Sequence, residues 1–327
     1  MSNEKKTRFC PICHGEKVQK WGYQNNKQRY RCSDCFHNFS LRNKGVQQSN
    51  QFIWFRKWIM ERQVYPYLIR DSGMSQRTIQ RLFKEYLKKA PMVSIRSKTH
   101  VHLLIDGTYF SKGLCLILYY DYDIQYVQLY RETNKEKLKE IKEDLKNLKR
   151  LGVDVYSVTC DDHSAILKAV AKVYPSAVIQ RCLVHIKRQI QNHLSKKPKL
   201  ELAKELLVIS KQITYIRSID QANFWLVDLH NWYEKNKQFV NEKTINESSG
   251  RWWYKHKNLH LAATHLINAI PNLFCYLNDP EIPHTSNQVE GYFSHLKEKL
   301  TLHRGLRFES KRNFIKWYIY FKNKRSK

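Results

Sequence analysis

Four acidic residues stand at positions where the chain could present carboxylates for metal chemistry. Asp106 lies inside the apolar stretch LLIDGTYF, and the adjacent pair Asp161 and Asp162 follows the apolar residues VTC. Glu290 lies near the start of the amphipathic stretch HTSNQVEGYFSHLKEKL, next to its apolar stripe. Carboxylates that converge in space can hold divalent cations such as Mg²⁺, which catalyse phosphoryl transfer. The sequence indicates that chemistry if the fold brings these residues together.

The elements that must position the aspartates follow Pro91. The patterns predict first three strands, over 101–110, 113–123 and 126–132, and then a helix over 133–150. A strand over 153–162 and a helix over 166–174 follow. The last predicted strand, over 176–185, runs into a helix that ends at 194. This order is the one expected of an RNase H-like α/β core. In such a core Asp106 and Asp161 lie on neighbouring central strands, with their carboxylates at one edge of the sheet.

Two of the acidic positions have alternative roles. Asn287 and Glu290 have the spacing of a capping box, in which the glutamate bonds the first amides of its helix, and composition favours neither capping nor metal binding. Side chains of adjacent residues that leave a strand point to opposite faces, which favours a single metal ligand in the aspartate pair. Asp162 is then a candidate cap of the following helix.

The N-terminal segment CPICHGEKVQKWGYQNNKQRYRCSDC contains two CxxC pairs, Cys10 with Cys13 and Cys32 with Cys35. Four thiolates complete a tetrahedral Zn²⁺ site. Two short strands around the turn QNNK predict a small zinc ribbon that depends on its structural zinc for folding. A redox role for the cysteine pairs is the alternative, and the paired spacing favours zinc.

Residues 46–92 predict a helix-turn-helix. Gly73 suits a turn with positive φ, Ser75 suits the N-cap of the second helix, and Ile79, Leu82, Phe83 and Leu87 form a buried stripe. The other face of this helix carries side chains able to contact a DNA groove, namely Gln76, Arg77, Gln80, Arg81 and Lys84. A solvated basic surface on an ordinary helical hairpin is the alternative, and the overall charge favours DNA.

The composition points to a polyanionic partner. The chain has 327 residues, and its 58 Lys and Arg against 29 Asp and Glu give a formal charge of +29. Nucleic acid is the usual partner of such a chain. The longest apolar run, residues 114–120, is too short to span a membrane, and the start MSNEKKTRF has no signal-peptide core, so a cytoplasmic protein is expected.

The chain resembles transposases of the Mutator-like superfamily, in the bacterial insertion-sequence branch. The resemblance rests on the order of five stretches: LLIDGTYF, VTCDDHSAI, QRCLVHIKRQI, RWWYKHKNLHLA and HTSNQVEGYFSHLKEKLTLHRGL. It implies a DDE triad of Asp106, Asp161 and Glu290 that binds catalytic Mg²⁺ or Mn²⁺. Asp162 departs from the pattern, because bacterial relatives often have glycine at that position.

The resemblance also covers a CxxH motif, Cys182 and His185, whose role stays open. A second zinc would need further ligands, and a place for His185 near the DNA or the active site is favoured. Residues from about 199 to 283 look like the helical insertion of such transposases. Within it Arg251, Trp252 and Trp253 are candidates to stack on an unpaired base.

The sequence therefore predicts an insertion-sequence transposase with three parts: a zinc ribbon over 1–45, a helix-turn-helix over 46–92, and an RNase H-like DDE catalytic domain over 93–327 with the helical insertion. It is expected to bind double-stranded DNA at the terminal inverted repeats, to cleave it and join it to target DNA on the chromosome, and to act as a homodimer or larger assembly. Two alternatives are a catalytically dead DNA-binding regulator and an RNase H-like nuclease without strand transfer.

Overall fold

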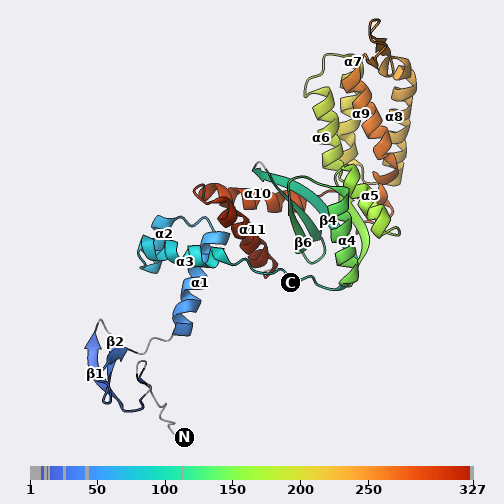
Figure 1. The fold of residues 1–327 in the computed structure, drawn as a ribbon. Coiled ribbons are helices and arrows are strands. Elements are labelled where there is room, and N and C mark those ends of the chain that lie inside the picture. The colour runs from blue at the N-terminus through green and yellow to red at the C-terminus, as the bar shows by residue number, and fades with distance from the viewer. Residues whose placement is uncertain are drawn as a thin grey trace. The chain divides into compact units, whose positions relative to one another are not determined.

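The computed structural model describes residues 9–10, 13, 15–24, 27–40, 44–111 and 113–324 (Figure 1). The chain divides into two compact units, Met1–Tyr86 and Leu87–Lys327. Within the described ranges, no helix is long and apolar enough to cross a membrane.

The first unit begins with a small antiparallel sheet in the order β1-β2-β3, formed by β1 (Val18–Gln24), β2 (Lys27–Cys32) and β3 (Asn38–Ser40). The two strands expected between the cysteine pairs are confirmed, whereas β3 was not predicted because it has only three residues. The tip of the predicted turn, residues 25 and 26, lies outside the described residues.

Three helices follow: α1 (Lys44–Met60), α2 (Tyr65–Ser72) and α3 (Gln76–Lys88). The predicted turn is confirmed, because Gly73 has a φ of 66° directly after the last residue of α2. The N–H of Gly73 bonds the carbonyl of Ile69, and this bond caps the end of the helix. The predicted cap of α3 is also confirmed, since the hydroxyl of Ser75 accepts a bond from the N–H of Thr78 at 3.3 Å.

A five-stranded mixed sheet forms the centre of the second unit. Its strands are β4 (Lys98–Ser111), β5 (Leu114–Asp121), β6 (Tyr126–Thr133), β7 (Val153–Cys160) and β8 (Val178–Arg181). The strand order is β6-β5-β4-β7-β8, with antiparallel pairing from β6 to β4 and parallel pairing from β4 to β8. The five predicted strands are all present, and β4 is the central one.

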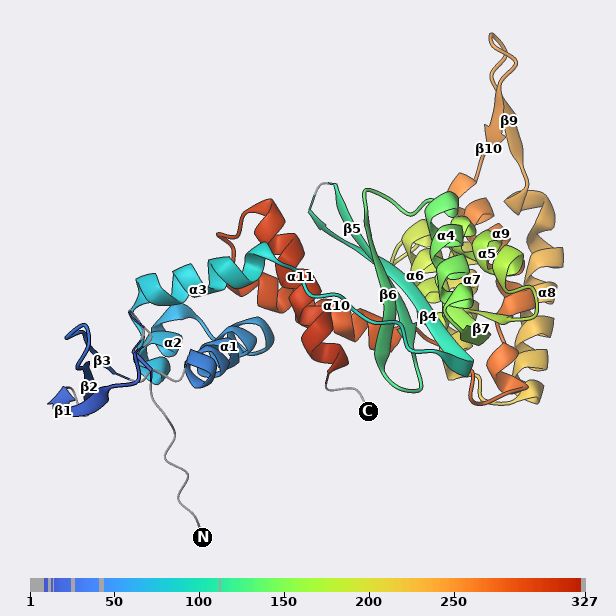
Figure 2. The ribbon, with the colours of Figure 1, turned by 60° about the horizontal axis from the view of Figure 1, so that its bottom comes forward.

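Helices cover both faces of this sheet (Figure 2). Two of them, α4 (Leu138–Arg150) and α5 (Ser164–Val173), pack the apolar residues Ile141, Leu145 and Ile166 against one face. The helices α10 (Asn287–Leu302) and α11 (Phe308–Asn323) contact β4 and β6. Stripes of apolar side chains at helical spacing on these helices explain why they pack on the sheet.

The predicted insertion is mainly helical and has its own core. Its elements, together with α6 (Leu183–Leu194), are α7 (Glu201–Gln212), η1 (Ile213–Tyr215), α8 (Ile219–Val240), β9 (Lys243–Ile245), β10 (Trp252–Tyr254), α9 (Lys257–Ala269), η2 (Ile270–Asn272) and η3 (Cys275–Leu277). Trp225 and Trp232 are buried in this core. The hairpin formed by β9 and β10 projects from the helices (Figure 2) and was not predicted.

The predicted strand over 176–185 is too long. The strand β8 ends at Arg181, and α6 begins at Leu183 after Cys182. The N–H of Ile186 bonds the carbonyl of Cys182 at 3.1 Å and closes the first helical turn. A short apolar run such as VIQRCLV cannot distinguish strand from helix, so the boundary was placed four residues too late.

The C-terminal helix closes the edge of the sheet through one side chain. The Asn323 side chain accepts a bond from the N–H of Val127 at 3.0 Å and donates one to the Val127 carbonyl at 2.9 Å. Both residues are buried, so these bonds satisfy a backbone pair on the edge strand β6 that water does not reach.

We expect Asn323→Ala to lower the free energy of unfolding by roughly 2–4 kcal/mol, because two buried backbone groups lose their partners. Urea unfolding of the full chain measures this. Asn231→Ala, at an exposed position of α8, is the matched control and should change stability by less than about 0.5 kcal/mol. Equal stability of the two variants would contradict the role given to Asn323.

Candidate active site

Parallel pairing of β4 with β7 brings Asp106 and Asp161 to adjacent positions. Ile105 is the register partner of Cys160, so the next residue on each strand path is an aspartate. Asp106 is only 5% exposed, whereas Asp161 is half-buried just beyond the end of β7. The sheet thus places the two aspartates at neighbouring backbone positions at one edge, as the sequence predicts.

A tight group forms around Asp106. The metal-binding atoms of Asp106, His185 and Glu290 all lie within 4.8 Å of one another. Glu290 is contributed by the first turn of α10 and His185 by the first turn of α6, and His185 Nε2 lies 3.3 Å from Glu290 Oε1. Three elements far apart in sequence therefore supply one group of possible ligands.

Glu290 does not cap its helix. Arg188 Nη1 and Nη2 donate to the two oxygens of Glu290 at 3.1 and 3.2 Å. Ser286 is the residue that precedes α10, which puts Glu290 one position beyond the place of a capping-box glutamate. The capping alternative is wrong, because the helix starts one residue earlier than the pattern suggests.

The two adjacent aspartates have different surroundings. Asp161 Oδ1 accepts a bond from the N–H of His163 at 3.0 Å. Asp162 forms an ion pair with Arg181, and its Oδ2 lies 3.0 Å from His265 Nδ1. Asp162 was a candidate cap of α5, but its carboxylate is taken by these two partners and His163 precedes the helix. The capping role of Asp162 is therefore wrong.

A further carboxylate, Glu136, lies beside the site and was missed by sequence reasoning. A Cβ on Gly107 would come within 2.0 Å of Glu136 Oε1, so only glycine leaves room for this carboxylate against β4. Burial and the nearby Asp161 raise the pKa of Glu136. The sequence carries no signal for it, because Glu136 precedes a helix whose charged residues look like a solvated face.

Burial and charge repulsion make the site receptive to a cation. Burial and the neighbouring Asp161 and Glu290 raise the pKa of Asp106 to about 7, although His185 and the N–H of Gly107 lower it. Burial lowers the pKa of His185, but Cys182 and the two carboxylates raise it to about 9. Carboxyl groups this close together cannot all ionise unless a positive charge lies between them. Their oxygens are therefore suitable ligands for a hard divalent cation.

The two residues of the CxxH motif act at different places. Cys182 is buried, and the N–H and hydroxyl of Ser286 both donate to its sulfur at 3.3 Å. Burial raises the pKa of Cys182, but bonds from His185 and Ser286 bring it below the usual value. Among the described residues, Cys182 belongs to no group of three possible metal ligands, so the motif contributes only His185 to the acidic group.

The four N-terminal cysteines also converge. Their sulfur atoms lie within 4.8 Å of one another, with Cys10 and Cys35 at 3.5 Å and Cys13 and Cys32 at 3.5 Å. A bond from the Gly15 backbone lowers the pKa of Cys13, but Cys35 and the other thiols raise it to about 12. This crowding of thiols fits a Zn²⁺ ion, whose charge would let all four ionise.

The residues predicted to contact DNA are exposed. On α3 these are Gln76, Arg77, Gln80, Arg81 and Lys84. In the projecting hairpin, Trp252 and Trp253 are 52% and 47% exposed, and Arg251 is exposed beside them. Lys243 Nζ lies 4.1 Å from the centroid of the Trp252 ring. The structure thus leaves both basic surfaces open to a partner.

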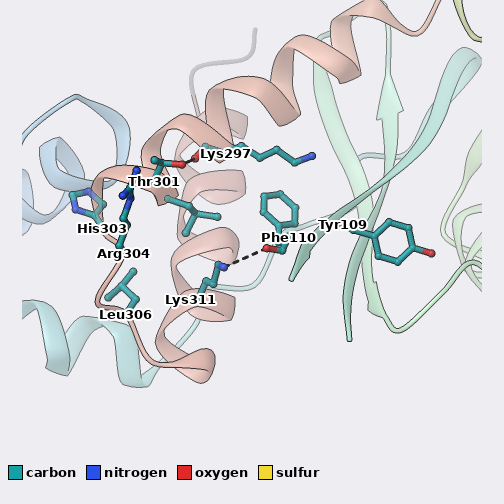
Figure 3. Close-up of a pocket in the computed structure, with 9 residues that line it drawn as sticks. Tyr109, Phe110, Lys297, Thr301, His303, Arg304, Leu306 and Lys311 are labelled. Carbon is teal, nitrogen blue, oxygen red and sulfur yellow. Dashed lines mark hydrogen bonds between the residues drawn. The ribbon is translucent and has the colours of Figure 1, made fainter. Parts of the chain in front are cut away.

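A basic cavity of about 420 Å³ lies near the end of β4 (Figure 3). It is lined by Tyr109, Phe110, Lys297, Leu300, Thr301, His303, Arg304, Leu306 and Lys311. Lys297 Nζ donates to the hydroxyl of Thr108 at 2.6 Å, and Lys311 Nζ donates to the Phe110 carbonyl at 3.4 Å. Thr108 follows Asp106 by two residues, so the cavity lies farther along β4 from the acidic site.

Comparison with known proteins gives a family match over part of the chain. Residues 126–270 are similar to the family described as "Transposase, Mutator family", and this match confirms the resemblance drawn from the motifs. The matched segment contains Asp161 and His185 but neither Asp106 nor Glu290. No curated protein matches the chain significantly.

Two solved structures are similar only at a low level. A chain of the Drosophila P element transposase strand transfer complex is 11% identical with a TM-score of 0.34, and the match covers 85% of this chain and 98% of that one. A chain of the simian T-cell lymphotropic virus intasome in complex with PP2A regulatory subunit B56 gamma is 13% identical with a TM-score of 0.21, covering 46% and 69%.

The raised pKa of Asp106 predicts a pH-dependent stability difference. Between pH 4 and 7 the unfolded chain releases this proton while the folded protein keeps it, so the folded state loses stability as the pH rises. At about 1.4 kcal/mol for each pKa unit, the cost approaches about 4 kcal/mol above pH 7. Asp106→Asn should remove that cost in buffer free of Mg²⁺ and Mn²⁺.

Urea unfolding at pH 4 and pH 8 measures the effect. The variant should match the wild type at pH 4 and exceed it at pH 8, whereas Asp154→Asn, an exposed acid on the same strand β7, should show no such change. A constant difference between variant and wild type at both pH values would refute the assignment.

Proposed function

We propose that this protein is a DDE-type DNA transposase of an insertion sequence, which cleaves DNA at the ends of its element and joins it to target DNA. The observation that carries the proposal is the meeting of Asp106 and Glu290 in one group of ligand atoms, with Asp161 at the adjacent strand position. The match of residues 126–270 to the Mutator transposases supports it independently.

The sheet supports an RNase H-like core for this activity. Three antiparallel strands, β6, β5 and β4, continue into two parallel strands, β7 and β8, in the order β6-β5-β4-β7-β8. This arrangement puts the first and fourth strands of the domain side by side at its centre. The core therefore presents the two aspartates of the triad from neighbouring strands.

Asp106, Asp161 and Glu290 are the residues that would hold Mg²⁺ or Mn²⁺. When bound, such an ion supplies Lewis-acid stabilisation of the phosphoryl oxygens. Arg188 bonds Glu290 in the protein alone, and its side chain is half exposed, so it can turn from the carboxylate to a DNA phosphate. His185 orients Glu290, since its Nε2 faces the carboxylate and its Nδ1 lies 3.3 Å from the Ser286 hydroxyl.

The reaction is a pair of in-line attacks at phosphorus. Water first attacks the scissile phosphodiester, and the bond to the 3′ oxygen breaks to free a 3′-hydroxyl. That hydroxyl then attacks a phosphodiester of the target strand, forms the new bond and displaces the target's own 3′ oxygen. Both steps need the same three carboxylates to fix the reacting groups, so one site serves cleavage and joining.

The basic cavity beside β4 suits the DNA strand next to the reacting phosphate. Lys297 and Lys311 lie near Phe110, and Arg304 lines another side of the cavity (Figure 3). Lys297 Nζ lies 5.6 Å from the centroid of the Phe110 ring. Cations bind phosphates, and an aromatic ring offers a surface for a base. We assign to this cavity the backbone adjoining the cleaved bond.

The remaining basic surfaces bind the element ends. In the proposed helix-turn-helix, α3 enters the major groove with its exposed face, and the zinc ribbon contacts phosphates. The hairpin carrying Arg251, Trp252 and Trp253 offers exposed rings to unpaired bases. Reaction at two element ends requires two sites, so the protein acts on double-stranded DNA as a homodimer or larger assembly.

The carboxylates are tested by incubating purified protein with DNA that flanks its own gene, with and without Mg²⁺ or Mn²⁺. Asp106→Asn, Asp161→Asn and Glu290→Gln should each lower the rate of cleavage and joining by at least about 10²–10³-fold, because each removes charge stabilisation of the transition state. Denaturing gels that resolve cleaved and joined strands measure both steps. Asp154→Asn, exposed on the same strand β7, is the matched control and should keep the wild-type rate.

Other outcomes would identify other functions. Binding of the flanking DNA without any metal-dependent cleavage indicates a DNA-binding regulator with an inactive core. Cleavage without joined product indicates a nuclease. Full activity in all three variants would show that these three carboxylates are not the catalytic residues.

The role of α3 is tested with Arg81→Ala in a binding assay on the same DNA. If Arg81 contacts a phosphate, binding weakens on every DNA sequence, and the slope of log K against log salt falls by about 0.9. If Arg81 contacts a base edge, the variant loses about 1–3 kcal/mol of binding free energy, and only on the element ends. Lys146→Ala, an exposed lysine of α4, is the control for charge alone. Equal affinity of Arg81→Ala and wild type on element ends and on other DNA would show that this face does not bind DNA.

A further inference from the structure

A second group of metal-binding side chains lies at the other end of β4. The ligand atoms of His100, His102 and Glu281 lie within 4.8 Å of one another. Both histidine Nε2 atoms lie 4.0 Å from Glu281 Oε2. His102 and Asp106 are four residues apart on the same strand, about 13 Å at the usual rise, so this group is separate from the candidate active site.

A buried hydrogen bond orients His102. The His102 ring is only 3% exposed, and its Nδ1 lies 2.7 Å from the hydroxyl of Ser157 on the neighbouring strand β7. When Nδ1 donates to this hydroxyl, Nε2 carries the free lone pair and faces Glu281. Fixing one ring nitrogen so that the other can bind is the usual support of a metal-ligating histidine.

His100 is held beside His102 by the backbone and by a neighbouring ring. Its φ of 54° lies in the left-handed region, which is uncommon outside glycine and turns the chain at this point. Its ring stacks on the ring of Tyr156, with 4.1 Å between the ring centroids. The centroid of the His102 ring lies 5.3 Å away. The Tyr156 hydroxyl donates to Asp279 Oδ2 at 2.7 Å, so the same tyrosine also fastens the segment that carries Glu281.

We propose that His100, His102 and Glu281 bind a divalent transition-metal cation of the zinc class. Two imidazoles and one carboxylate are a preferred ligand set for such ions, and the exposed side of His100 leaves a position for water. The ion joins the start of β4 to the segment that leads from the insertion into α10. It thereby fixes the path of the chain just before the helix that carries Glu290.

Metal counting on the full chain tests this site. The protein is purified with zinc at its four N-terminal cysteines, freed of loosely held metal, and titrated calorimetrically with Zn²⁺ in excess Mg²⁺. Wild type should bind one more zinc than His100→Ala and Glu281→Gln. Glu281 is exposed, so Glu281→Gln should leave the melting temperature without added zinc unchanged. Ser157→Ala should keep the site but bind about tenfold more weakly, because His102 loses its orienting bond.

Two control variants separate this site from other zinc ligands. Glu290→Gln in the candidate active site and His295→Ala, an exposed histidine of α10, should both keep the additional zinc. Equal zinc binding by wild type, His100→Ala and Glu281→Gln would overturn the proposal, as would loss of the additional zinc in Glu290→Gln. None of these outcomes depends on the DNA reaction, so the metal site and the proposed function are tested separately.

Discussion

The parallel pairing of β4 with β7 is the constraint on which the site depends. It aligns Ile105 with Cys160 and so puts Asp106 on β4 level with Asp161, the first residue beyond β7. The pairing also buries Asp106, which makes its ionisation costly unless positive charge is near. One backbone register thus determines where the two aspartates lie and makes the ionisation of Asp106 depend on a nearby positive charge.

The third carboxylate reaches the site because both ends of the insertion are tied to the sheet. At the entry, Cys182 accepts two bonds from Ser286, which stands at the exit. The Leu183 N–H bonds the His284 carbonyl, and the Thr159 hydroxyl bonds the Pro283 carbonyl. A long helical segment can therefore project from the core without displacing Glu290, since the chain leaves and returns at neighbouring points.

Charge is arranged in layers around the carboxylates. Directly beside them, His185 and Arg188 contact Glu290 and offset part of the negative charge. Farther out, Lys297 and the other cations of the cavity next to β4 form a basic surface. In the proposed reaction the outer charges would attract DNA phosphates, while the inner ones would leave room for metal. The net charge of +29 agrees with this arrangement.

The sequence by itself determined the features that rest on local patterns. These are the alternation of strands and helices, the turn at Gly73 with the cap at Ser75, the two cysteine pairs, and the places of Asp106 within a strand and Asp161 at the end of another. Strand periodicity and turn chemistry act over a few residues, so they can be read without a fold. Only the tertiary structure decided that Glu136 lies against Gly107, that Arg188 holds Glu290, and that Asp162 pairs with Arg181 and His265. These contacts join segments up to about a hundred residues apart, and packing rather than local pattern selects such partners.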